Sequence, residues 1–299
     1  MNHLAQNCDF CPIACGANRA AGEAGACGAD GEMYIARAAL HHWEEPVISG
    51  TAGSGTIFFS NCSMKCAYCQ NHKISMEGVG KKSTVDDLVD MMRDLESQGA
   101  MNINFVTGTH YRTQIISAVR AANVNIPIVW NSSGYETVSS IAALSQVVDV
   151  WLPDFKYADD SLCKELSGNN ISNYSSVALE AIATMLDFCP ERKFDIFGET
   201  ARMTRGIIVR QLLLPGHLDN SKRALKLLFD NFGNDVKYSI MNQFTPVCKV
   251  PGHPELDAPA SEAEYEELLC YADDLGIEDY YWQQGGTVDE SFIPEFYDE

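Results

Sequence analysis

The sequence predicts an α/β fold, a partial (β/α)6 TIM-like barrel with a cysteine-rich N-terminal extension. From Gly50 onwards, strand-like and helix-like segments alternate, whereas the cysteine-rich segment 8–28 has neither period, and seven of the eleven cysteines fall before residue 70. Alternating strands and helices indicate parallel βαβ units, and about six units indicate an open or partial barrel instead of a complete eightfold one. We therefore expect a metal-binding extension at residues 1–49 and a barrel domain at residues 50–299 that ends in a helix and a tail.

The expected strands are short runs of apolar, β-branched and aromatic residues that end in turn signals. They are residues 55–61, 102–110, 126–134, 148–157, 206–216 and 236–244. The expected helices between and after them are residues 83–99, 112–124, 137–147, two segments in the 160s and 180s, 221–233 and 261–276. The helix at 83–99 has the clearest pattern, because Ser83 is a candidate cap, Gly99 a stop, and the apolar residues recur at helical spacing.

Composition limits the compartment and the partners. The chain has 41 acidic and 21 basic residues, a formal charge of −20, which disfavours binding to nucleic acid or anionic membranes. No apolar run approaches the ~20 residues of a membrane span, and the N-terminus lacks a signal-peptide pattern. A cytoplasmic, reducing location follows, in which clustered cysteines indicate metal binding in preference to disulfides.

Four of the cysteines lie in the Gly- and Ala-rich extension: Cys8, Cys11, Cys15 and Cys27. Such a segment has little means of ordering itself except a shared metal, whose binding energy contributes to folding. Four thiolates complete a tetrahedral zinc site or hold an iron–sulfur cluster, and the sequence leaves both open. The alternative is a flexible arm of unrelated cysteines. We expect the four scattered cysteines to be small buried apolar residues: Cys163, Cys189, Cys248 and Cys270.

Polar residues recur where the expected strands end. They are the cysteine loop that begins at Cys62, Thr107-Gly108-Thr109-His110, Asn131-Ser132-Ser133, Asp154 and Lys156, Arg210 with Pro215-Gly216-His217, and Asn242-Gln243. Each alone is explained as a helix cap or a loop residue. Because ligands gather at the carboxyl ends of parallel strands, their recurrence there favours a functional site.

Two other stretches receive structural interpretations. "GTAGSG" precedes a strand instead of joining a strand to a helix, so a turn explains it better than a nucleotide-binding loop. "LHHWEEP" offers a candidate metal group in His41, His42, Glu44 and Glu45. Without a second supporting cluster, we favour a loop that packs Trp43 against the barrel.

The pattern Cys62-x3-Cys66-x2-Cys69, with Tyr68 before the third cysteine, resembles the signature of the radical S-adenosylmethionine (SAM) superfamily. The resemblance extends from Gly50 to about Asn242 and is strongest to the pyruvate formate-lyase activating enzyme branch, especially its uncharacterised relatives with a cysteine-rich N-terminus. It implies a 4Fe–4S cluster in which three thiolates hold three irons and the fourth iron binds SAM. The alternatives are a zinc site, for which a second CxxC pair is absent nearby, or inert buried thiols.

The same resemblance implies roles for the strand-end residues. Thr107, Gly108 and Thr109 stand where the superfamily has a Gly-Gly-Glu-Pro-like motif that contacts the cofactor's amino group, although the acidic residue and one glycine are missing here. Asn131 and Ser133 match polar residues that reach the ribose or the carboxylate. Asp154 and Lys156 resemble the Asp-x-Lys pair of activating enzymes, and Arg210 their arginine on the next-to-last strand. Lys156 or Arg210 would suit the methionyl carboxylate; a salt bridge with Asp154 is the structural alternative.

The resemblance implies an oxidoreductase that cleaves SAM to methionine and a 5′-deoxyadenosyl radical, which takes a hydrogen atom from a substrate; no acid–base residue is needed as the catalyst. One hypothesis is activation of a glycyl radical enzyme at a glycine α-hydrogen, with a flavodoxin- or ferredoxin-type electron donor. The second is radical modification of a small molecule, peptide or RNA base, and the third a noncatalytic metal-stabilised binding module. Almost no insertion follows Ser75, as in a minimal activase, whereas the cysteine-rich arm departs from that pattern.

Overall fold

The computed structural model describes residues 5–168, 171–283 and 296. Within them, ten strands form one sheet: β1 (Met33–His41), β2 (Ser54–Phe59), β3 (Lys81–Ser83), β4 (Ile103–Val106), β5 (Ile128–Ser132), β6 (Val150–Pro153), β7 (Lys193–Phe197), β8 (Thr200–Leu212), β9 (Lys237–Met241) and β10 (Tyr280–Trp282). Their order is β10-β9-β8-β6-β5-β4-β2-β1-β3, and β7 pairs with β8 outside this path.

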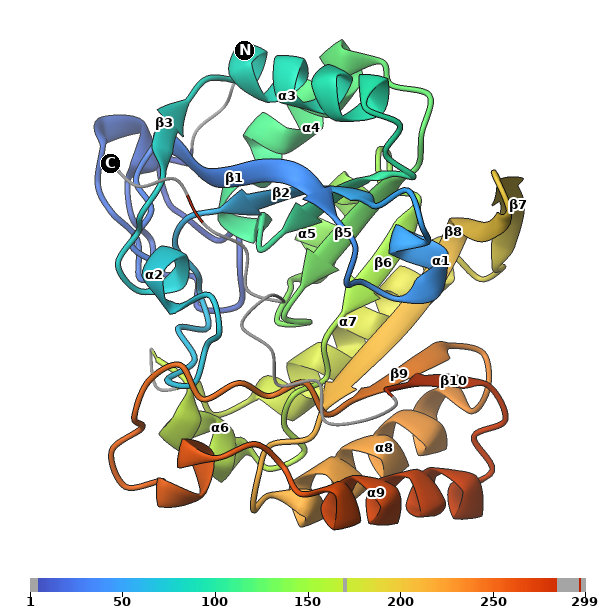
Figure 1. Cartoon of the computed structure of the whole chain (residues 1–299). Helices are drawn as coiled ribbons and strands as arrows, with labels where there is room; N and C mark the ends of the chain where they lie inside the picture. The colour runs from blue at the N-terminus through green and yellow to red at the C-terminus, as the bar shows by residue number, and fades with distance from the viewer. Residues whose placement is uncertain (1–4, 169–170, 284–295, 297–299) are drawn as a thin grey trace.

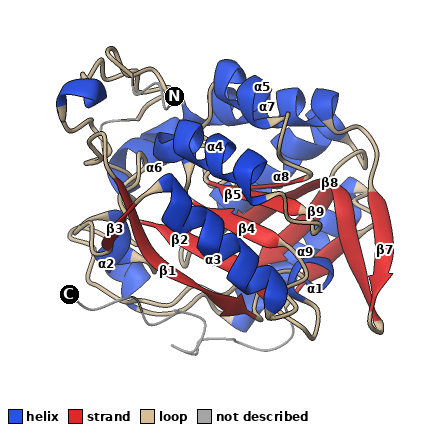
Figure 2. Cartoon of the chain, turned by 90° about the horizontal axis from the view of Figure 1, so that it is seen from above, coloured by secondary structure: helices blue, strands red, loops and turns tan. Residues whose placement is uncertain are grey.

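Helices lie between most of the strands and cover the outer face of the curved sheet (Figures 1 and 2). The α-helices are α1 (Pro46–Ser49), α2 (His72–Ser75), α3 (Val85–Ser97), α4 (Arg112–Ala122), α5 (Val138–Leu144), α6 (Asp160–Leu166), α7 (Tyr174–Phe188), α8 (Leu218–Phe232) and α9 (Glu262–Leu275). Three 3₁₀ turns are η1 (Arg19–Ala21), η2 (Thr109–Tyr111) and η3 (Pro254–Asp257). None of the helices in the described part of the chain is both long and apolar enough to span a membrane.

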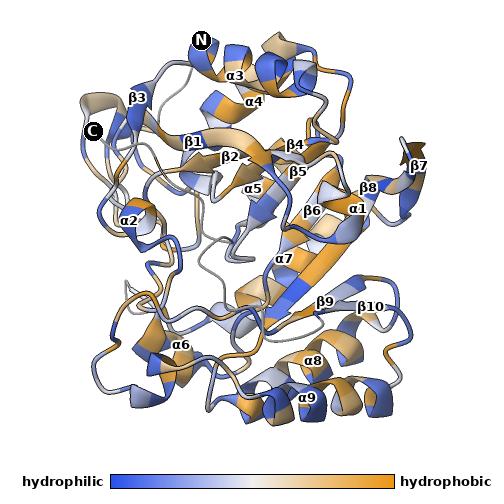
Figure 3. Ribbon diagram, in the orientation of Figure 1, coloured by the Kyte–Doolittle hydropathy of each residue, from blue (hydrophilic) through white to orange (hydrophobic). Residues whose placement is uncertain are grey.

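The pairing of the strands confirms the predicted partial barrel. From β2 through β4, β5, β6, β8 and β9 to β10, every neighbouring pair is parallel, whereas β1 pairs antiparallel with both β2 and β3. Residues of β2, β4, β5, β6 and β9 are buried throughout, as expected for parallel strands covered on both faces. Figure 3 shows hydrophobic colouring along these strands and hydrophilic residues on the outer sides of α8 and α9.

The local sequence explains how α3 begins. Thr84 is its N-cap, and Thr84 and Asp87 form a capping box in which each side chain accepts a hydrogen bond from the other's backbone N–H. Ser83, the expected cap, is instead the last residue of β3. The buried residues Leu88, Val89, Met92 and Leu95 lie on the predicted apolar face of the helix.

Two features were not predicted from the sequence. Strand β1 lies inside the segment expected to be a separate extension, so the sheet begins at Met33 and not after residue 49. The fifth predicted strand, expected from Gly206, begins at Thr200 and forms with β7 an antiparallel hairpin that projects from the barrel (Figure 2). Residues of β7 are largely exposed although Phe194 and Ile196 alternate with charged residues, and a run of five residues is too short to identify a strand with certainty. The predicted C-terminal tail lies outside the described residues except for Phe296.

The centre of the barrel wall should dominate stability. Phe105 in β4 is 0 % exposed and packs against Phe59 and Trp130, so Phe105→Ala should lower the free energy of unfolding by about 3–5 kcal/mol. The same change at Phe194, which is 50 % exposed on the hairpin, should cost less than about 1 kcal/mol. Urea unfolding of both variants measures the difference, and equal losses would contradict this account of the core.

Candidate active site

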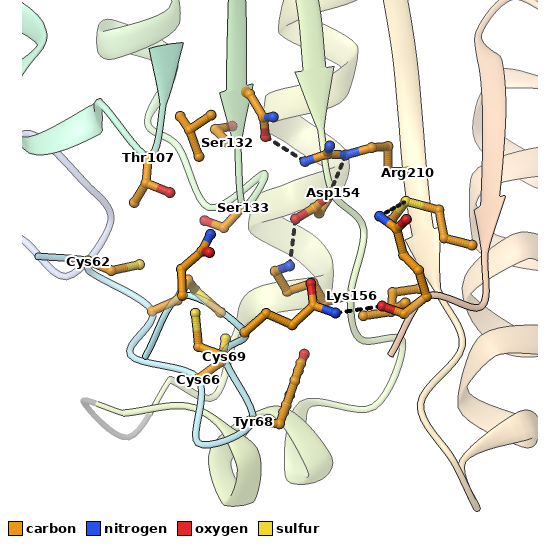
Figure 4. A pocket seen from close by; sticks show the side chains of 18 of the residues that line it. Cys62, Cys66, Tyr68, Cys69, Thr107, Ser132, Ser133, Asp154, Lys156 and Arg210 are labelled. Carbon is orange, nitrogen blue, oxygen red and sulfur yellow. Dashed lines mark hydrogen bonds and ion pairs between the residues drawn. The ribbon is translucent and has the colours of Figure 1, made fainter. Parts of the chain in front are cut away.

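A cavity of about 210 Å³ opens at the carboxyl ends of the parallel strands. Ten of the predicted site residues line it: Cys62, Cys66, Tyr68, Cys69, Thr107, Asn131, Ser133, Asp154, Lys156 and Arg210. Figure 4 shows the three cysteines at one end of this cavity, Asp154 and Arg210 at the other, and Lys156 between them. The topology therefore brings together side chains that are up to 148 positions apart in the sequence, counted from Cys62 to Arg210.

The cysteine loop between β2 and α2 is fixed by its backbone. Asn61 and Lys65 adopt the left-handed conformation, with φ of 73° and 45°, which turns the chain sharply on either side of Cys62. The Asn61 N–H donates to the carbonyl of Ile74 at 2.7 Å, and the Ala67 N–H donates to the carbonyl of Leu166 at the end of α6 at 2.8 Å. These bonds hold the loop against α2 and the end of α6.

The three thiols fit an iron–sulfur cluster as ligands. Burial raises the pKa of Cys62 to about 11 and that of Cys66 to about 12, and it also raises the pKa of Cys69. Protein groups alone therefore leave all three as neutral thiols, whereas binding to a metal removes their protons. Thiolate is the ligand that iron–sulfur clusters use, and three thiolates leave one iron of a 4Fe–4S cluster without a protein ligand.

Lys156 and Tyr157 support negative charge at this end of the cavity. The positive charge of Lys156 acts on all three cysteines and opposes the effect of burial. The Tyr157 hydroxyl donates to Tyr68 at 2.9 Å and also lies 4.0 Å from the Cys66 sulfur. Hydrogen bonds to ligand sulfurs tune iron–sulfur clusters, so Tyr157 is a positioning residue that the sequence analysis did not identify.

A network of charges occupies the other end. Arg210 Nε donates to Asp154 at 2.8 Å, one terminal nitrogen donates to Glu44 at 3.2 Å and the other to Asn131 at 2.5 Å. Lys156 Nζ donates to the second oxygen of Asp154 at 2.5 Å. Burial alone would raise the pKa of Asp154, but Arg210 and Lys156 outweigh it and hold that pKa below its ordinary value. Lys156 and Arg210 therefore both form the salt bridges with Asp154 that were the structural alternative to cofactor binding.

Glu44 is the main site residue that the sequence analysis misjudged. Its side chain is only 9 % exposed, and it accepts hydrogen bonds from Asn104 at 3.0 Å and Asn131 at 3.3 Å in addition to Arg210. Burial raises the pKa of Glu44, and Arg210 opposes the shift. Trp43, expected to pack against the barrel, is 50 % exposed and lines the cavity.

Gly108 and Thr109 do not line the cavity, unlike Thr107. Thr109 Oγ1 donates to the buried carboxylate of Glu136 at 2.6 Å, and Trp130 Nε1 donates to the same oxygen at 3.2 Å. A side chain at position 108 would lie 2.6 Å from Ile115 and 2.9 Å from Trp130, so glycine permits the close packing here.

The other predicted strand-end residues separate into two groups. Gln243 lines the cavity and its carbonyl accepts from Gln70 Nε2 at 2.6 Å. His217 lies outside the lining and contacts Glu255 at 3.1 Å, and the same Glu255 oxygen contacts His253 at 2.9 Å. Of the scattered cysteines, Cys163 and Cys189 are buried as expected, whereas Cys248 is half-buried and Cys270 exposed.

The comparisons with known proteins agree with this geometry. Residues 56–201 match the model of the radical SAM superfamily, which indicates a radical SAM domain in this part of the chain. The cofactors of that superfamily are a 4Fe–4S cluster and SAM.

Two relatives illustrate the extent of the similarity. An uncharacterised protein of Methanocaldococcus jannaschii is 29 % identical over 294 residues, which cover 93 % of this chain and 78 % of the relative. SuiB of Streptococcus suis, whose crystal structure contains S-adenosylmethionine, superposes with a TM-score of 0.51 at 12 % identity. That match covers 80 % of this chain but only 51 % of SuiB, and it shows a shared fold.

Removing Arg210 should destabilise the chain, because Glu44 and Asp154 would remain buried without their shared cation. Arg210→Met should cost about 3–5 kcal/mol, whereas Arg120→Met, at an exposed hydrogen bond to Gln146, should cost less than about 1 kcal/mol. Adding Glu44→Gln to Arg210→Met should recover part of the loss. Equal urea stability of the two single variants would contradict the assigned role.

Glu136 should make stability depend on pH. Burial raises its pKa from 4.5 to about 7, so the folded chain holds this proton more tightly than the unfolded chain. Its contribution to the unfolding free energy should therefore decrease as pH rises from about 4.5 to about 7 and stay low above that. Glu136→Gln should remove this decrease and stabilise the chain at pH 8 by on the order of 2 kcal/mol. Urea unfolding of the natural chain and of Glu136→Gln at pH 5 to 8 measures this effect. A difference in unfolding free energy between the two that does not change with pH would contradict it.

Proposed function

We propose that this chain cleaves SAM reductively at a 4Fe–4S cluster held by Cys62, Cys66 and Cys69, and uses the 5′-deoxyadenosyl radical to abstract a hydrogen atom from a polypeptide. The α-hydrogen of a glycine in a partner glycyl radical enzyme is the candidate atom. The observation that carries the proposal is the set of three thiols, Cys66 buried and Cys62 and Cys69 half-buried, that face a cavity with no fourth thiol among its described lining residues.

Lys156 is the best candidate for binding the cofactor's carboxylate. Arg210 already directs three of its five N–H donors to Asp154, Glu44 and Asn131. Lys156 has three donors and gives one to Asp154, so it retains capacity for another anion on the side that faces the cysteines. We therefore assign Arg210 to positioning and Lys156 to direct binding.

The remaining lining residues suit polar contacts of different kinds. The Asn131 side chain is occupied on both sides, because its oxygen accepts from Arg210 and its nitrogen donates to Glu44. Thr107 and Ser133 keep hydroxyl groups on the cavity wall, where they can contact the ribose or the amino group. Gly134 allows the chain to turn directly after Ser133 with a φ of 74°, where any side chain would collide with the carbonyl of Asp154.

The size of the cavity supports a substrate that approaches from outside. Its 210 Å³ is below the ~300–1,000 Å³ usual for ligand pockets, so the cofactor would leave little room for a second small molecule. Within the described residues the sheet runs from β10 to β3 without closing, which leaves room for a chain segment to approach from outside. A small molecule or peptide remains the alternative substrate class, and the charge of −20 disfavours an RNA base.

The proposed reaction needs an electron donor and a reducing compartment. All eleven cysteines are free thiols, which suits a reducing cytoplasm. A flavodoxin- or ferredoxin-type protein is the proposed donor, because the reaction consumes one electron for each SAM cleaved.

Cys66→Ala should abolish formation of 5′-deoxyadenosine, because the cluster loses one of its three ligands. Cys270→Ala, at an exposed thiol on α9, is the matched control and should cleave SAM as the natural chain does. The measurement is chromatographic detection of 5′-deoxyadenosine after anaerobic addition of SAM and dithionite, with circular dichroism to check folding. Cleavage retained in a folded Cys66→Ala chain would refute the cluster assignment.

Isotope transfer tests the substrate. A partner enzyme labelled with α-deuterated glycine should pass deuterium into 5′-deoxyadenosine and acquire a glycyl radical detectable by electron paramagnetic resonance. Deuterium transfer from a labelled small molecule, with none from the labelled protein, would favour the alternative.

A further inference from the structure

The four cysteines of the N-terminal arm, residues 5–31, gather at one place. Cys8 and Cys27 are close enough to Cys11 to raise the pKa of its thiol, and Cys8 also acts to lower the pKa of Cys15. A side chain at Gly25 would lie 3.1 Å from the Cys15 sulfur and 3.7 Å from the Cys27 sulfur. None of the four lines the active-site cavity, so they form a separate group.

The arm has too little apolar core to explain its own order. Its own buried apolar cluster consists of Cys8, Phe10 and Ala17, while Cys27 and Ala29 join the main core of the barrel, and its regular structure is the three-residue turn η1. Backbone bonds nevertheless fold it back on itself, including Cys8 N–H to Ala17 O at 3.1 Å and Gly25 N–H to Ala29 O at 2.9 Å. A bound metal would supply the ordering energy that this small core lacks.

A buried arginine beside the cysteines lacks a carboxylate. Arg19 is 2 % exposed, lies between the rings of Phe10 and Tyr111, and donates to the backbone carbonyls of Asp30 and His110. In the described part of the chain, no acidic side chain forms an ion pair with it. A buried cation without a counter-charge is costly, and Cys27 is close enough to feel its charge. A metal centre with four thiolates carries the negative charge that would compensate Arg19.

The spacing of the sulfurs favours an iron–sulfur cluster over zinc. Among the His, Cys, Asp and Glu side chains in residues 5–168, 171–283 and 296, only His217, His253 and Glu255 bring three ligand atoms within 4.8 Å of one another. No three arm sulfurs are therefore that close, whereas a tetrahedral zinc with Zn–S of ~2.3 Å holds its sulfurs ~3.8 Å apart. The active-site cysteines share this wider spacing.

The ligand spacing agrees. Structural zinc sites commonly draw their ligands in two closely spaced pairs, but here three cysteines come from one short loop and Cys27 stands alone, separated from Cys15 by eleven residues. We propose that Cys8, Cys11, Cys15 and Cys27 hold a second iron–sulfur cluster, ligated completely by the protein.

The arm abuts the active-site loop. A side chain at Gly28, next to Cys27, would lie 2.7 Å from the side-chain oxygen of Asn61 and 3.7 Å from the amine of Lys65, and these two residues flank Cys62. The segment that carries Cys27 therefore packs directly against the loop that carries Cys62. A cluster with four protein ligands has no open iron for SAM, so this second cluster suits electron transfer.

Metal analysis of variants tests the inference separately from the proposed function. A chain with Cys62, Cys66 and Cys69 all changed to Ala should, after anaerobic reconstitution with iron and sulfide, hold about four irons and about four acid-labile sulfides. It should also give a paramagnetic signal when reduced. A chain with the four arm cysteines changed to Ala should hold about four irons at the other site.

If a variant fails to fold, the metal content of the natural chain tests the inference instead. It should contain about eight irons and no stoichiometric zinc, and so should the control Cys270→Ala. About four irons with one zinc in the natural chain, or zinc without sulfide in the first variant, would overturn the inference. Loss of SAM cleavage with iron retained in the arm would instead count against the proposed function alone.

Discussion

Arg210 is the residue on which the geometry of the cavity depends. From β8 it bonds to Asp154 after β6, to Asn131 in β5 and to Glu44 in the segment between β1 and α1. Four segments that are distant in sequence therefore meet at one guanidinium. Two carboxylates, Glu44 and Asp154, are bonded to the cations Arg210 and Lys156, and the charge of Glu45 also acts on Arg210, so removing Arg210 leaves uncompensated negative charge. Such a network holds side-chain positions in the absence of a ligand.

Lys156 links this network to the thiols. Its amine is tied to Asp154 on one side, while its charge acts on Cys62, Cys66 and Cys69 on the other. The position of the cation next to the cluster ligands is thus set by Asp154, which Arg210 holds in turn. The active site is pre-organised from the strand ends towards the cysteine loop, and the loop's own backbone bonds complete the arrangement.

Sequence reasoning could predict what is encoded locally and not what depends on tertiary contacts. The parallel strands were predictable because their buried residues form continuous apolar runs, and the cysteine spacing predicted that Cys62, Cys66 and Cys69 belong to one site, where the structure places them together. Strand β7 was missed although Phe194 and Ile196 alternate with charged residues, because the run is only five residues long and its pairing with β8 is a tertiary contact. Glu44 was misjudged because its burial depends on Arg210, 166 positions away. Gly108 and Thr109 were grouped with Thr107, but the η2 turn directs Thr109 to Glu136 instead of the cavity.

The position of the N-terminal arm suggests a role for its four cysteines, which are not part of the Cys62-x3-Cys66-x2-Cys69 signature. Arg19 joins the arm to the barrel by donating to Asp30 on one side and to His110 on the other, and Arg112 of α4 stacks over the Phe10 ring at 3.9 Å. The Ser140 hydroxyl of α5 donates to the Phe10 carbonyl at 2.7 Å. These contacts fix the arm to the barrel beside the cysteine loop. A merely structural metal would not need to be held at the wall of the active site, whereas a redox centre would, because electron transfer depends on a short and constant separation.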